Sequence, residues 1–353
     1  TYYVDPSGAG NFLTIQDAVD HASDGNTIIV RDGTYPECVV VNRPLTITSA
    51  NGPEKTIVSP SASNPVFTIA SDGVTIRGFG IVNANANGID GSGYQNCVVE
   101  GNVITGTESK YGVYLHPGNY SVLRNNVITS QKYGVTITGS SGDIVENNTV
   151  SGTSMGINIQ TNSHNMTVTG NTLQSTGSST NCISLRIYNN IEDVHVEGNS
   201  FSGGQVTVVL SNTRNISVLD NRITGGSWHA IQASDISNAD IRGNTIIAGS
   251  RTGLYAYRLT GFKVWLNNFT LTQSNEWGLV EGEMPSINSM TPVTYTYANT
   301  THTGYLGNYY STYTGTDADG DGIGDTPFVD EPMSAGSTIT VYDHHPLISP
   351  PEH

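Results

Sequence analysis

The chain has 353 residues, of which 36% are hydrophobic and 12% charged, and its formal net charge is −16. Such an acidic chain lacks the basic surface that attracts nucleic acids or anionic membranes, so we expect neither as a partner. No apolar run approaches the roughly 20 residues that cross a bilayer as a helix, so we expect no transmembrane segment in this chain. The start at Thr1 fits a processed or trimmed secreted protein.

The first predicted element is a short helix that covers the N-terminal end of the fold. Thr14 is suited to cap this helix, with Asp17 three residues later. The apolar residues that follow recur at the spacing of one helical face: Ile15, Ala18, Val19 and Ala22. We assign residues 1–25 to an N-terminal helical cap. Short strands of less regular spacing follow, between Thr27 and Ile76.

Asparagine then returns at nearly constant intervals of 24, 22, 23, 28, 22, 23 and 24 residues. A period of this length is typical of solenoids, in which each repeat buries its apolar face against its neighbours. Asparagines stacked at one corner can also bond from coil to coil, so we interpret them as structural. They are Asn102, Asn126, Asn148, Asn171, Asn199, Asn221, Asn244 and Asn268. The longest interval predicts an insertion, which we place around residues 186–192.

Short runs between the asparagines alternate inward and outward residues, such as GVYL at 112–115 and GVTI at 134–137. The alternation predicts strands, and no helical pattern lies between them. Two or three strands with Gly, Asn and Ser corners fill a coil of about 22–24 residues. We therefore predict an all-β fold in which residues 26–272 form a single-stranded parallel β-helix. Its right-handedness is expected from the general preference of parallel crossovers.

The remaining segment, residues 273–353, has a different composition, and we assign it to a C-terminal cap. Its alternating VTYTY run predicts strands that pack on the last coil. The later run DADGDGIGD has carboxylates at positions 1, 3, 5 and 9 and glycine at 6, the pattern of a calcium-binding loop. We predict calcium as cofactor, held by Asp317, Asp319, Asp321, the carbonyl of Ile323, and Asp325. Because position 12 is Phe328, a bidentate ligand would have to come from Asp330, Glu331 or elsewhere.

Outward residues of the alternating strands are expected to form columns along the solenoid. Aromatic rings mixed with amides and hydroxyls suit sugar binding, because rings stack on sugars and polar groups orient their hydroxyls. One expected column is Tyr114, exposed Thr136, Asn158, Ser184, Gln232 and Tyr255, and the next is His116, Thr138, Gln160, Arg186, Ser234 and Tyr257. A third column has Lys110–Tyr111, Lys132–Tyr133 and Trp228–His229. The predicted ligand-binding residues are Tyr114, His116, Asn158, Gln160, Arg186, Tyr255 and Tyr257; a solvated face without ligand is the alternative.

A catalytic centre is a further alternative on the same face. Lyases and epimerases of uronates need a base, an acid and a cation that neutralises the carboxylate. Tyr111, His116 and Arg186 are the available groups, and no carboxylate accompanies them on the 111–116 strand. Asp143 and Glu146 lie near a corner asparagine and are expected to face solvent, so they do not predict a hydrolase.

Metal and disulfide chemistry elsewhere in the chain has weaker signals. Met155, His164 and Met166 offer soft ligands suited to copper, although methionine in a strand is usually core. The three cysteines, Cys38, Cys97 and Cys182, are too widely spaced for a zinc site or a disulfide framework. We expect them to pack in the core, and a bridge between Cys38 and Cys97 stays open.

Three stretches resemble NosD-type parallel β-helix repeat proteins, which are found on archaeal and bacterial cell surfaces. The opening TYYVDPSGAGNFLTIQDAVDHASDGNTIIV and the GNxI coils are shared with many β-helix proteins. The ending, GNYYSTYTGTDADGDGIGDTPFVDE with YDHHPLISP, is more specific to the family. Tyr310 stands where the family tends to have Trp, and the stretch 331–342 is longer than usual. The run YGVYLH is also similar to the YGFDPH strand of mannuronan epimerases, but Tyr114 stands where they have a catalytic Asp.

The resemblance implies a secreted or cell-surface module, associated with an S-layer or another envelope layer. As its partner we expect a polysaccharide or a cell-envelope glycoprotein. The leading hypothesis is non-catalytic glycan binding. A uronate lyase or epimerase using Tyr111, His116 and Arg186 is the first alternative, and a periplasmic copper-handling protein is the second.

Overall fold

The computed structural model describes residues 1–83, 86–106, 110–129, 132–176, 182–270, 275–331 and 340–351. Contacts divide the chain into two compact units, Thr1–Thr176 (unit 1) and Gly177–His353 (unit 2). Each unit is a parallel β-solenoid, and the chain makes about 11 turns with one short helix among the described residues. The predicted parallel β-helix is therefore confirmed. The division into two units was not predicted from the sequence.

The helix, α1 (Ile15–His21), begins where its capping residue was predicted. The Thr14 hydroxyl accepts the backbone N–H of Asp17 at 3.1 Å. Glu37 adds a second cap, since its carboxylate accepts the N–H groups of Ile15 and Gln16 at 2.8 and 2.9 Å. A negative charge at a helix N-terminus satisfies free N–H groups and complements the helix dipole.

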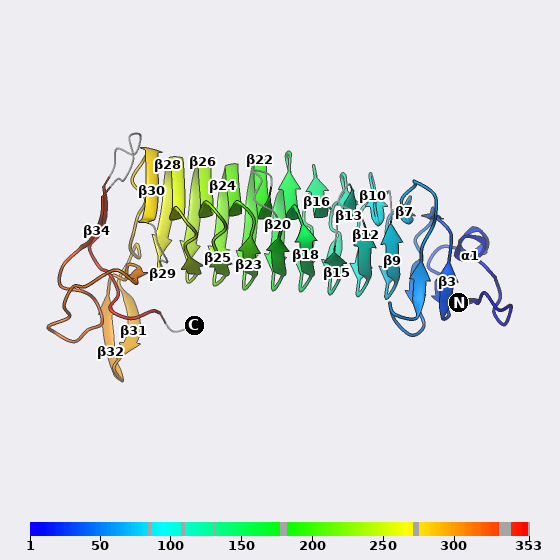
Figure 1. Ribbon diagram of the computed structural model, residues 1–353, viewed down its shortest axis with the longest axis horizontal. Helices are drawn as coiled ribbons and strands as arrows, with labels where there is room; N and C mark the ends of the chain where they lie inside the picture. Colours follow the sequence, from blue (N-terminus) through cyan, green and yellow to red (C-terminus); the bar gives the residue numbers. More distant parts are fainter. Residues whose placement is uncertain are drawn as a thin grey trace. The chain divides into compact units, whose positions relative to one another are not determined.

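Unit 1 has three strands per coil, and equivalent strands pair in parallel to form three stacks (Figure 1). Stack 1 contains β1 (Tyr2–Val4), β2 (Thr27–Val30), β5 (Thr46–Ser49), β8 (Thr75–Arg77), β11 (Val98–Glu100), β14 (Val122–Arg124), β17 (Ile144–Glu146) and β20 (His164–Thr169). Stack 2 contains β4 (Val39–Val41), β7 (Phe67–Ile69), β10 (Ile89–Gly91), β13 (Tyr111–Leu115), β16 (Tyr133–Thr138) and β19 (Met155–Gln160). Stack 3 contains β3 (Gly33–Tyr35), β6 (Thr56–Val58), β9 (Gly80–Asn83), β12 (Val103–Gly106), β15 (Val127–Thr129), β18 (Thr149–Thr153) and β21 (Thr172–Ser175).

Unit 2 has one long and one short strand in most coils, because the equivalents of stacks 1 and 2 are continuous (Figure 1). The long strands are β22 (Ile183–Glu197), β24 (Val206–Leu219), β26 (His229–Arg242), β28 (Thr252–Trp265) and the shorter β30 (Asn275–Gly282). The short strands are β23 (Ser200–Gly203), β25 (Arg222–Thr224), β27 (Thr245–Ile247), β29 (Asn268–Thr270) and β33 (Tyr309–Tyr310). Two antiparallel pairs complete the unit: β31 (Val293–Tyr297) with β32 (Thr300–Gly304), and β34 (Phe328–Asp330) with β35 (Val341–Asp343).

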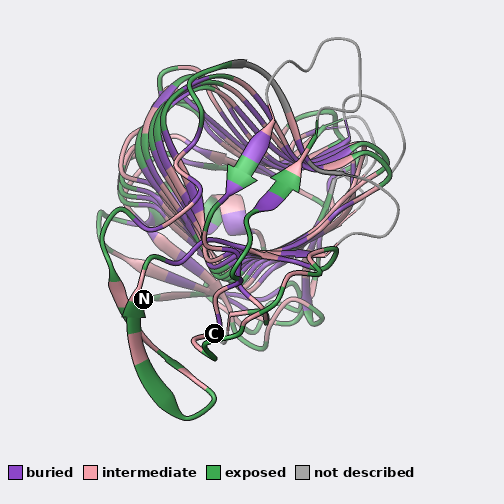
Figure 2. Cartoon of the chain, turned by 90° about the vertical axis from the view of Figure 1, so that its left-hand side faces the viewer, coloured by how far each residue is buried: buried purple, intermediate pink, exposed green. Residues whose placement is uncertain are grey.

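The core consists of inward aliphatic residues that lie directly above one another. In stack 2, Val113 pairs with Val135 and Val135 with Ile157, and all three are 0% exposed. Figure 2 shows the resulting bands of buried residues along the stacked strands. Gly112 precedes Val113 because a Cβ there would lie 2.6 Å from the carbonyl oxygen of Gly134 in the next coil. Small residues at this position thus allow the coils to approach closely.

The repeating asparagines are buried and form hydrogen-bonded ladders in both units. In unit 1, the N–H and Nδ2 of Asn126 both donate to Oδ1 of Asn148, at 3.0 and 2.9 Å, and Asn148 donates to Asn171 in the same way. Each Nδ2 also donates to a backbone carbonyl, such as that of Leu123 for Asn148 at 2.8 Å. The structural interpretation of these asparagines is therefore confirmed. The ladders contain Asn102, Asn126, Asn148 and Asn171 in unit 1, and Asn199, Asn221, Asn244, Asn267 and Asn308 in unit 2.

Asn268 was wrongly predicted as a member, because the buried ladder residue is Asn267. In the preceding coils, from Asn102 to Asn244, the residue before the ladder asparagine is Gly, Asn or Asp with positive φ, as at Asn147 (φ 55°). Leu266 (φ 55°) occupies this position, so the usual sequence pattern before the ladder asparagine is absent and does not point to Asn267. The ladder of unit 2 then continues to Asn308, 41 residues later, and ends at Asp343, whose Oδ2 accepts the N–H of Asn308 at 2.8 Å.

The insertion was also misplaced, since residues 186–192 lie within strand β22 rather than in a loop. Pairing of β22 with β24 shifts only between Tyr188 and Ile191, where one extra residue is accommodated. Cys182 accepts the N–H of Gln205 from the next coil, so most of the added length precedes Cys182. That stretch includes residues 177–181, which lie outside the described residues.

Parallel pairing also extends beyond the expected end of the helix at residue 272. Strand β30 pairs with β28, and β33 pairs with β29. The VTYTY run forms a hairpin strand, β31, that pairs antiparallel with β32. The predicted end of the rhythm after Leu271 falls outside the described residues.

We predict that Asn148→Leu destabilises the protein by several kcal/mol, because it removes the partners of buried backbone groups of Asn126 and Leu123, each worth about 1–3 kcal/mol. Denaturant unfolding measures the loss. The matched control is exposed Asn147→Gly, which keeps a residue suited to positive φ and should change stability by less than about 0.5 kcal/mol. An equal loss of unfolding free energy in the two variants would contradict the contribution of the asparagine ladder to stability.

Asp143 is fully buried, and its expected exposure to solvent was wrong. Its Oδ1 accepts the N–H of Ser121 at 2.8 Å, and its Oδ2 accepts the Ser140 hydroxyl. Burial raises the pKa of Asp143 from 3.8 to about 6, against the opposing effect of both hydrogen bonds. Glu146, in contrast, is half-buried and forms an ion pair with Arg124 at 3.8 Å.

The raised pKa makes the folded state bind a proton that the unfolded state releases between about pH 4 and 6. This group's contribution to stability is therefore favourable at acid pH and is lost as pH rises through 6. We predict that Asp143→Asn stabilises the protein by up to about 3 kcal/mol above pH 6 and has little effect near pH 4. The amide can still accept from Ser121 and donate to Ser140. Unfolding titrations from pH 4 to 8, with exposed Asp24→Asn as control, test this; a gain independent of pH would contradict it.

Candidate functional site

The outward residues of stack 2 form a column in unit 1, as predicted. Strand register aligns Asp90, Tyr114, Thr136 and Asn158 on successive strands. Thr138 and Gln160 align beside them. The column therefore presents rings, hydroxyls and amides on one side of the sheet.

Aromatic rings gather on this column. The rings of Tyr111 and Tyr133 stack with centroids 4.8 Å apart, and Tyr111 lies 4.9 Å from Tyr114. His116 packs edge-on against Tyr114 at 6.2 Å. The ammonium of Lys132 lies 5.3 Å from the ring centroid of Tyr133. We call this set the unit-1 face: Tyr111, Tyr114, His116, Tyr133, Asn158 and Gln160.

Amides and hydroxyls connect the same face. Asn158 Nδ2 donates to Gln160 Oε1 at 3.3 Å, and Gln160 Nε2 donates to Thr138 Oγ1 at 3.0 Å. Thr136 is buried at 0% exposure, so its expected exposure was wrong. Thr136 Oγ1 and Asn158 Oδ1 are buried without a hydrogen-bond partner among the described residues. Buried polar atoms normally have partners, so these two favour a site that a polar ligand completes.

Asp90 is a residue that sequence reasoning missed. It pairs in register with Tyr114, one coil away, and accepts hydrogen bonds from Asn87 Nδ2 and Ser92 Oγ, both at 2.9 Å. Burial raises the pKa of the Tyr114 hydroxyl, and the negative charge of Asp90 adds to that shift. A signal was present, because GID at 88–90 has the same pattern as GVY at 112–114. The absence of a carboxylate from the 111–116 strand did not exclude one from the next coil.

Within unit 2, the strand register differs from the predicted columns by two residues, because Arg186 rather than Ser184 aligns with Gln232. Ser184 was expected outside, but it is 0% exposed and its hydroxyl donates to the carbonyl of Ser202 at 2.5 Å. Arg186 instead belongs to the first column, with Val209, Gln232 and Tyr255. The second column is Tyr188, Ser211, Ser234 and Tyr257. The additional residues before and within β22 concealed this register.

A second aromatic cluster covers the outward side of β26 and β28. His229 stacks on Tyr255 with centroids 4.8 Å apart and lies 5.5 Å from Trp228, which is 36% exposed. His229 Nδ1 lies 2.6 Å from Thr252 Oγ1. Burial lowers the pKa of His229 to about 4, and the positive charge of Arg251 lowers it further, so the imidazole is neutral at physiological pH. We call this set the unit-2 face: Arg186, Tyr188, Trp228, His229, Arg251, Tyr255 and Tyr257.

Two of the three residues proposed for catalysis lie close to Tyr114: Tyr111 on the same strand, and His116 directly after that strand. The third, Arg186, belongs to unit 2. Tyr114 keeps its proton at neutral pH because its pKa is raised, so it serves as a hydrogen-bond donor rather than a base. The geometry of the unit-1 face therefore suits binding of hydroxyl-rich ligands better than proton abstraction.

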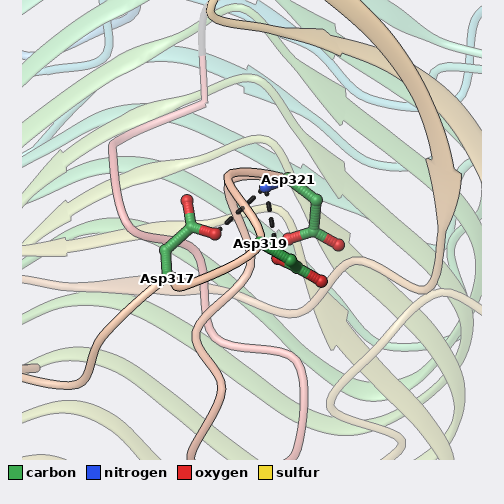
Figure 3. A group of neighbouring side chains, drawn as sticks. All are labelled: Asp317, Asp319 and Asp321. Carbon is green, nitrogen blue, oxygen red and sulfur yellow. Dashed lines mark hydrogen bonds between the residues drawn. The ribbon is translucent and has the colours of Figure 1, made fainter.

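The Asp/Gly run forms a tight loop with three carboxylates drawn together (Figure 3). Ligand oxygens of Asp317, Asp319 and Asp321 lie within 4.8 Å of one another, the one group of this kind among the described residues. Asp317 Oδ1 accepts the N–H groups of Gly320 and Asp321 at 2.8 and 3.0 Å. This acidic triad can bind a metal, since hard cations prefer clustered oxygens.

Other predicted ligands surround the triad less closely. Asp325 lies outside this group and accepts the N–H of Ala318 at 2.8 Å through Oδ2. Ile323 donates its N–H to Asp321 Oδ1 at 2.8 Å, and it bridges to Leu347. Tyr295, missed from the sequence, donates its hydroxyl to the carbonyl of Asp321 at 2.9 Å. Burial raises the pKa of Tyr295 to about 12, with a further contribution from the three carboxylates.

The residues considered for copper do not share one environment. Met155 and Met166 are buried in the core at 3% and 1% exposure, whereas His164 is exposed. The three cysteines are free, with Cys97 and Cys182 buried and Cys38 half-buried. The bridge left open between Cys38 and Cys97 is thus not formed.

The fold and these sites define a β-solenoid with aromatic outward faces and an acidic loop near its C-terminal end. The family model described as "Periplasmic copper-binding protein (NosD)" matches residues 19–193 and 181–284. This chain belongs to the NosD family, and the predicted resemblance is confirmed.

A curated relative, a "Cell surface glycoprotein" of Methanothermus fervidus, is 39% identical over 95 residues. The match covers 26% of this chain and 16% of the relative, so the two share only a part of their lengths. Among the described residues, no helix combines the length and apolar character needed to cross a membrane.

Solved structures with the same fold include a module of an epimerase and a domain of a phage tailspike. The A-module of the mannuronan C-5 epimerase AlgE6 of Azotobacter vinelandii aligns over 76% of this chain and 95% of its own, with a TM-score of 0.51 and 16% identity. The enzymatically active domain of tailspike protein 2 of bacteriophage CBA120 covers 75% of this chain and 43% of its own, with a TM-score of 0.53 and 13% identity. At such identities these similarities establish the fold alone.

Proposed function

We propose that this chain is a glycan-binding module of a cell surface, extracellular in location. The observation that carries the proposal is the pairing of stacked rings with amides and hydroxyls on the outward faces, as in Tyr111, Tyr133, Asn158 and Gln160. Rings offer flat apolar surfaces to the C–H faces of sugars, and the polar groups orient sugar hydroxyls. The buried, unpartnered Thr136 Oγ1 adds a hydrogen-bonding group that a sugar hydroxyl can satisfy.

The surface location is supported by the relative named "Cell surface glycoprotein" and by a family described as periplasmic. A net charge of −16 suits solubility outside the cell. The partner would be a polysaccharide or an envelope glycoprotein, which includes an S-layer. A copper-handling role has less support, because the clustered metal ligands among the described residues are carboxylates rather than the sulfur and imidazole ligands that copper prefers.

We further infer that the acidic loop binds calcium, through Asp317, Asp319, Asp321 and the carbonyl of Ile323. Oxygen ligands drawn within 4.8 Å suit Ca²⁺, and three unneutralised carboxylates would repel one another. Asp325 would join as a further ligand only by exchanging its bond to Ala318. The cation would thereby tighten the loop.

The calcium loop also has a structural connection to the end of the solenoid. Gly324 donates its N–H to the carbonyl of Pro346 at 2.8 Å, and Ile348 donates to that of Gly322 at 3.0 Å. The same segment contains Asp343, the residue that ends the asparagine ladder of unit 2. Calcium would therefore stabilise the cap that closes the last coil.

Uronate lyase or epimerase activity is the second candidate function, and Asp90 is the observation that favours it. Asp90 lies in register with Tyr114 on β13, and His116 directly follows that strand. A carboxylate, a histidine and a tyrosine are suitable acid–base groups. The raised pKa of Tyr114 argues against its use as a base.

Binding to a glycan array, run beside an assay for unsaturated uronate ends, tests the two candidates together. We predict binding without product. Trp228→Ala and Tyr255→Ala should each weaken binding by about tenfold or more, since stacking rings supply much of the contact energy. Tyr342→Ala, an exposed tyrosine outside the face, is the matched control. Formation of product would contradict the non-catalytic binding function and favour the lyase or epimerase. A protein that binds no glycan would contradict both candidate functions.

Chelation should lower the melting temperature of the protein, because saturating calcium at a hundredfold excess over Kd stabilises the bound state by about 2.7 kcal/mol. Protease should then cut first within residues 305–347. Asp321→Ala should melt like the chelated protein and ignore added calcium, whereas exposed Asp24→Ala should behave as wild type. A wild-type melt insensitive to chelator would leave the loop as an acidic turn without a cation.

A further inference from the structure

The unit-2 face contains two arginines, Arg186 and Arg251, that form no ion pair with a described carboxylate. Five of the ten arginines form ion pairs with Asp or Glu within 4.0 Å: Arg31, Arg124, Arg214, Arg242 and Arg258. Of the five that form none among the described residues, Arg186 and Arg251 are the two that lie over an aromatic ring. A guanidinium group held on a ring without an acidic partner calls for an explanation.

Both guanidinium groups rest on aromatic rings instead. Arg186 Cζ lies 3.6 Å from the ring centroid of Tyr188, and Arg251 Cζ lies 4.5 Å from that of Trp228. Stacking holds the planar group in place while leaving its N–H edge available for a bidentate contact with an anion. Arg186 Nε is in addition buried without a hydrogen-bond partner among the described residues.

No second positive charge comes from the neighbouring imidazole of His229. His229 stays neutral beside Arg251, and the lowered pKa of that imidazole reflects burial first and the charge of Arg251 second. Arg258, the third arginine near this face, differs because Asp235 neutralises it at 2.8 Å. The positive potential on the unit-2 face therefore centres on Arg186 and Arg251.

The two arginines are too far apart for one small ligand. Arg186 lies on β22 and Arg251 immediately precedes β28, three strands further along the pairing β22–β24–β26–β28. At about 4.8 Å per strand, their backbones are roughly 14 Å apart along the stack. The rings of Trp228 and His229 lie one strand before Arg251, and Tyr255 lies on β28 in the column of Arg186. Such a row suits successive units of a polymer rather than a single sugar.

We infer that the unit-2 face selects acidic polysaccharides, with Arg186 and Arg251 contacting carboxylate or sulfate groups on separate sugar units. The inference rests on the proposed glycan binding and specifies its ligand. The rings would supply affinity for sugar in general, and the arginines would supply the preference for charge. Because the chain as a whole is acidic, a polyanion would gain nothing from the general surface, and the preference would depend on these two residues.

The test measures binding of the 353-residue chain to polygalacturonate, dextran sulfate and uncharged dextran, at low and at physiological salt. We expect at least tenfold tighter binding to one or both charged polymers than to dextran, weakened by salt. Arg186→Gln with Arg251→Gln should remove that preference, so that the charged polymers bind the variant no more tightly than dextran does. Arg222→Gln, an exposed arginine on the short strand β25, is the matched control. Thermal melts check that each variant remains folded.

The outcomes separate this inference from the proposed function. A preference for polygalacturonate alone identifies carboxylate as the recognised group, and a preference for dextran sulfate alone identifies sulfate. Equal binding of charged and neutral polymers, or a charge preference that survives the double variant, would overturn the inference while leaving glycan binding intact. If no polymer binds, both proposals are wrong. Tighter binding of long acidic oligomers than of single sugars is a further expected result, since one sugar cannot span both arginines.

Discussion

From Asn102 onward, the regular coils depend on burying one asparagine amide per coil with its hydrogen bonds satisfied. A ladder asparagine such as Asn148 donates to a backbone carbonyl, that of Leu123, and to the next asparagine, Asn171. Its Oδ1 accepts two hydrogen bonds from the previous asparagine, Asn126. An unpaired amide would be costly in the core, so each coil requires its neighbours in one register. That register aligns the inward aliphatic residues and, on the opposite side of the strands, the outward rings. The sites on the faces are thus a consequence of the packing in the core.

The periodic part of this arrangement was predictable from the sequence. Buried amides recur with the coil length, and alternating aliphatic residues reveal the strands, so the fold class and most ladder members followed directly. Prediction failed where a local substitution or an insertion interrupted the pattern. Leu266 at positive φ shifted the last ladder position by one residue, to Asn267. Asn308 and Asp343 were missed because the next steps of the ladder span 41 and 35 residues, far from the coil length.

The sequence predicted the kinds of residue in the candidate sites, but it did not predict every residue that belongs to them. The unit-1 face and the acidic triad emerged because their residues follow one another in sequence or at the coil period. Asp90 was not predicted because it lies on β10, one coil before Tyr114, and strand pairing rather than closeness in sequence brings the two residues together. Tyr188 and Arg251 were missed because an insertion shifts one of them and the other precedes its strand. Contacts between ring and guanidinium depend on side-chain packing, which periodicity does not encode.

In the proposed function, rings held by the core and arginines held by the rings would form a surface already arranged for a polymer, which would limit the entropy lost on binding. The most direct measurement is a crystal structure of the chain with an acidic oligosaccharide. Our account predicts sugar rings stacked on Trp228 and Tyr255, with acidic groups within hydrogen-bonding distance of Arg186 and Arg251. An oligosaccharide bound along stack 3, or at the acidic loop with these four side chains in solvent, would contradict it.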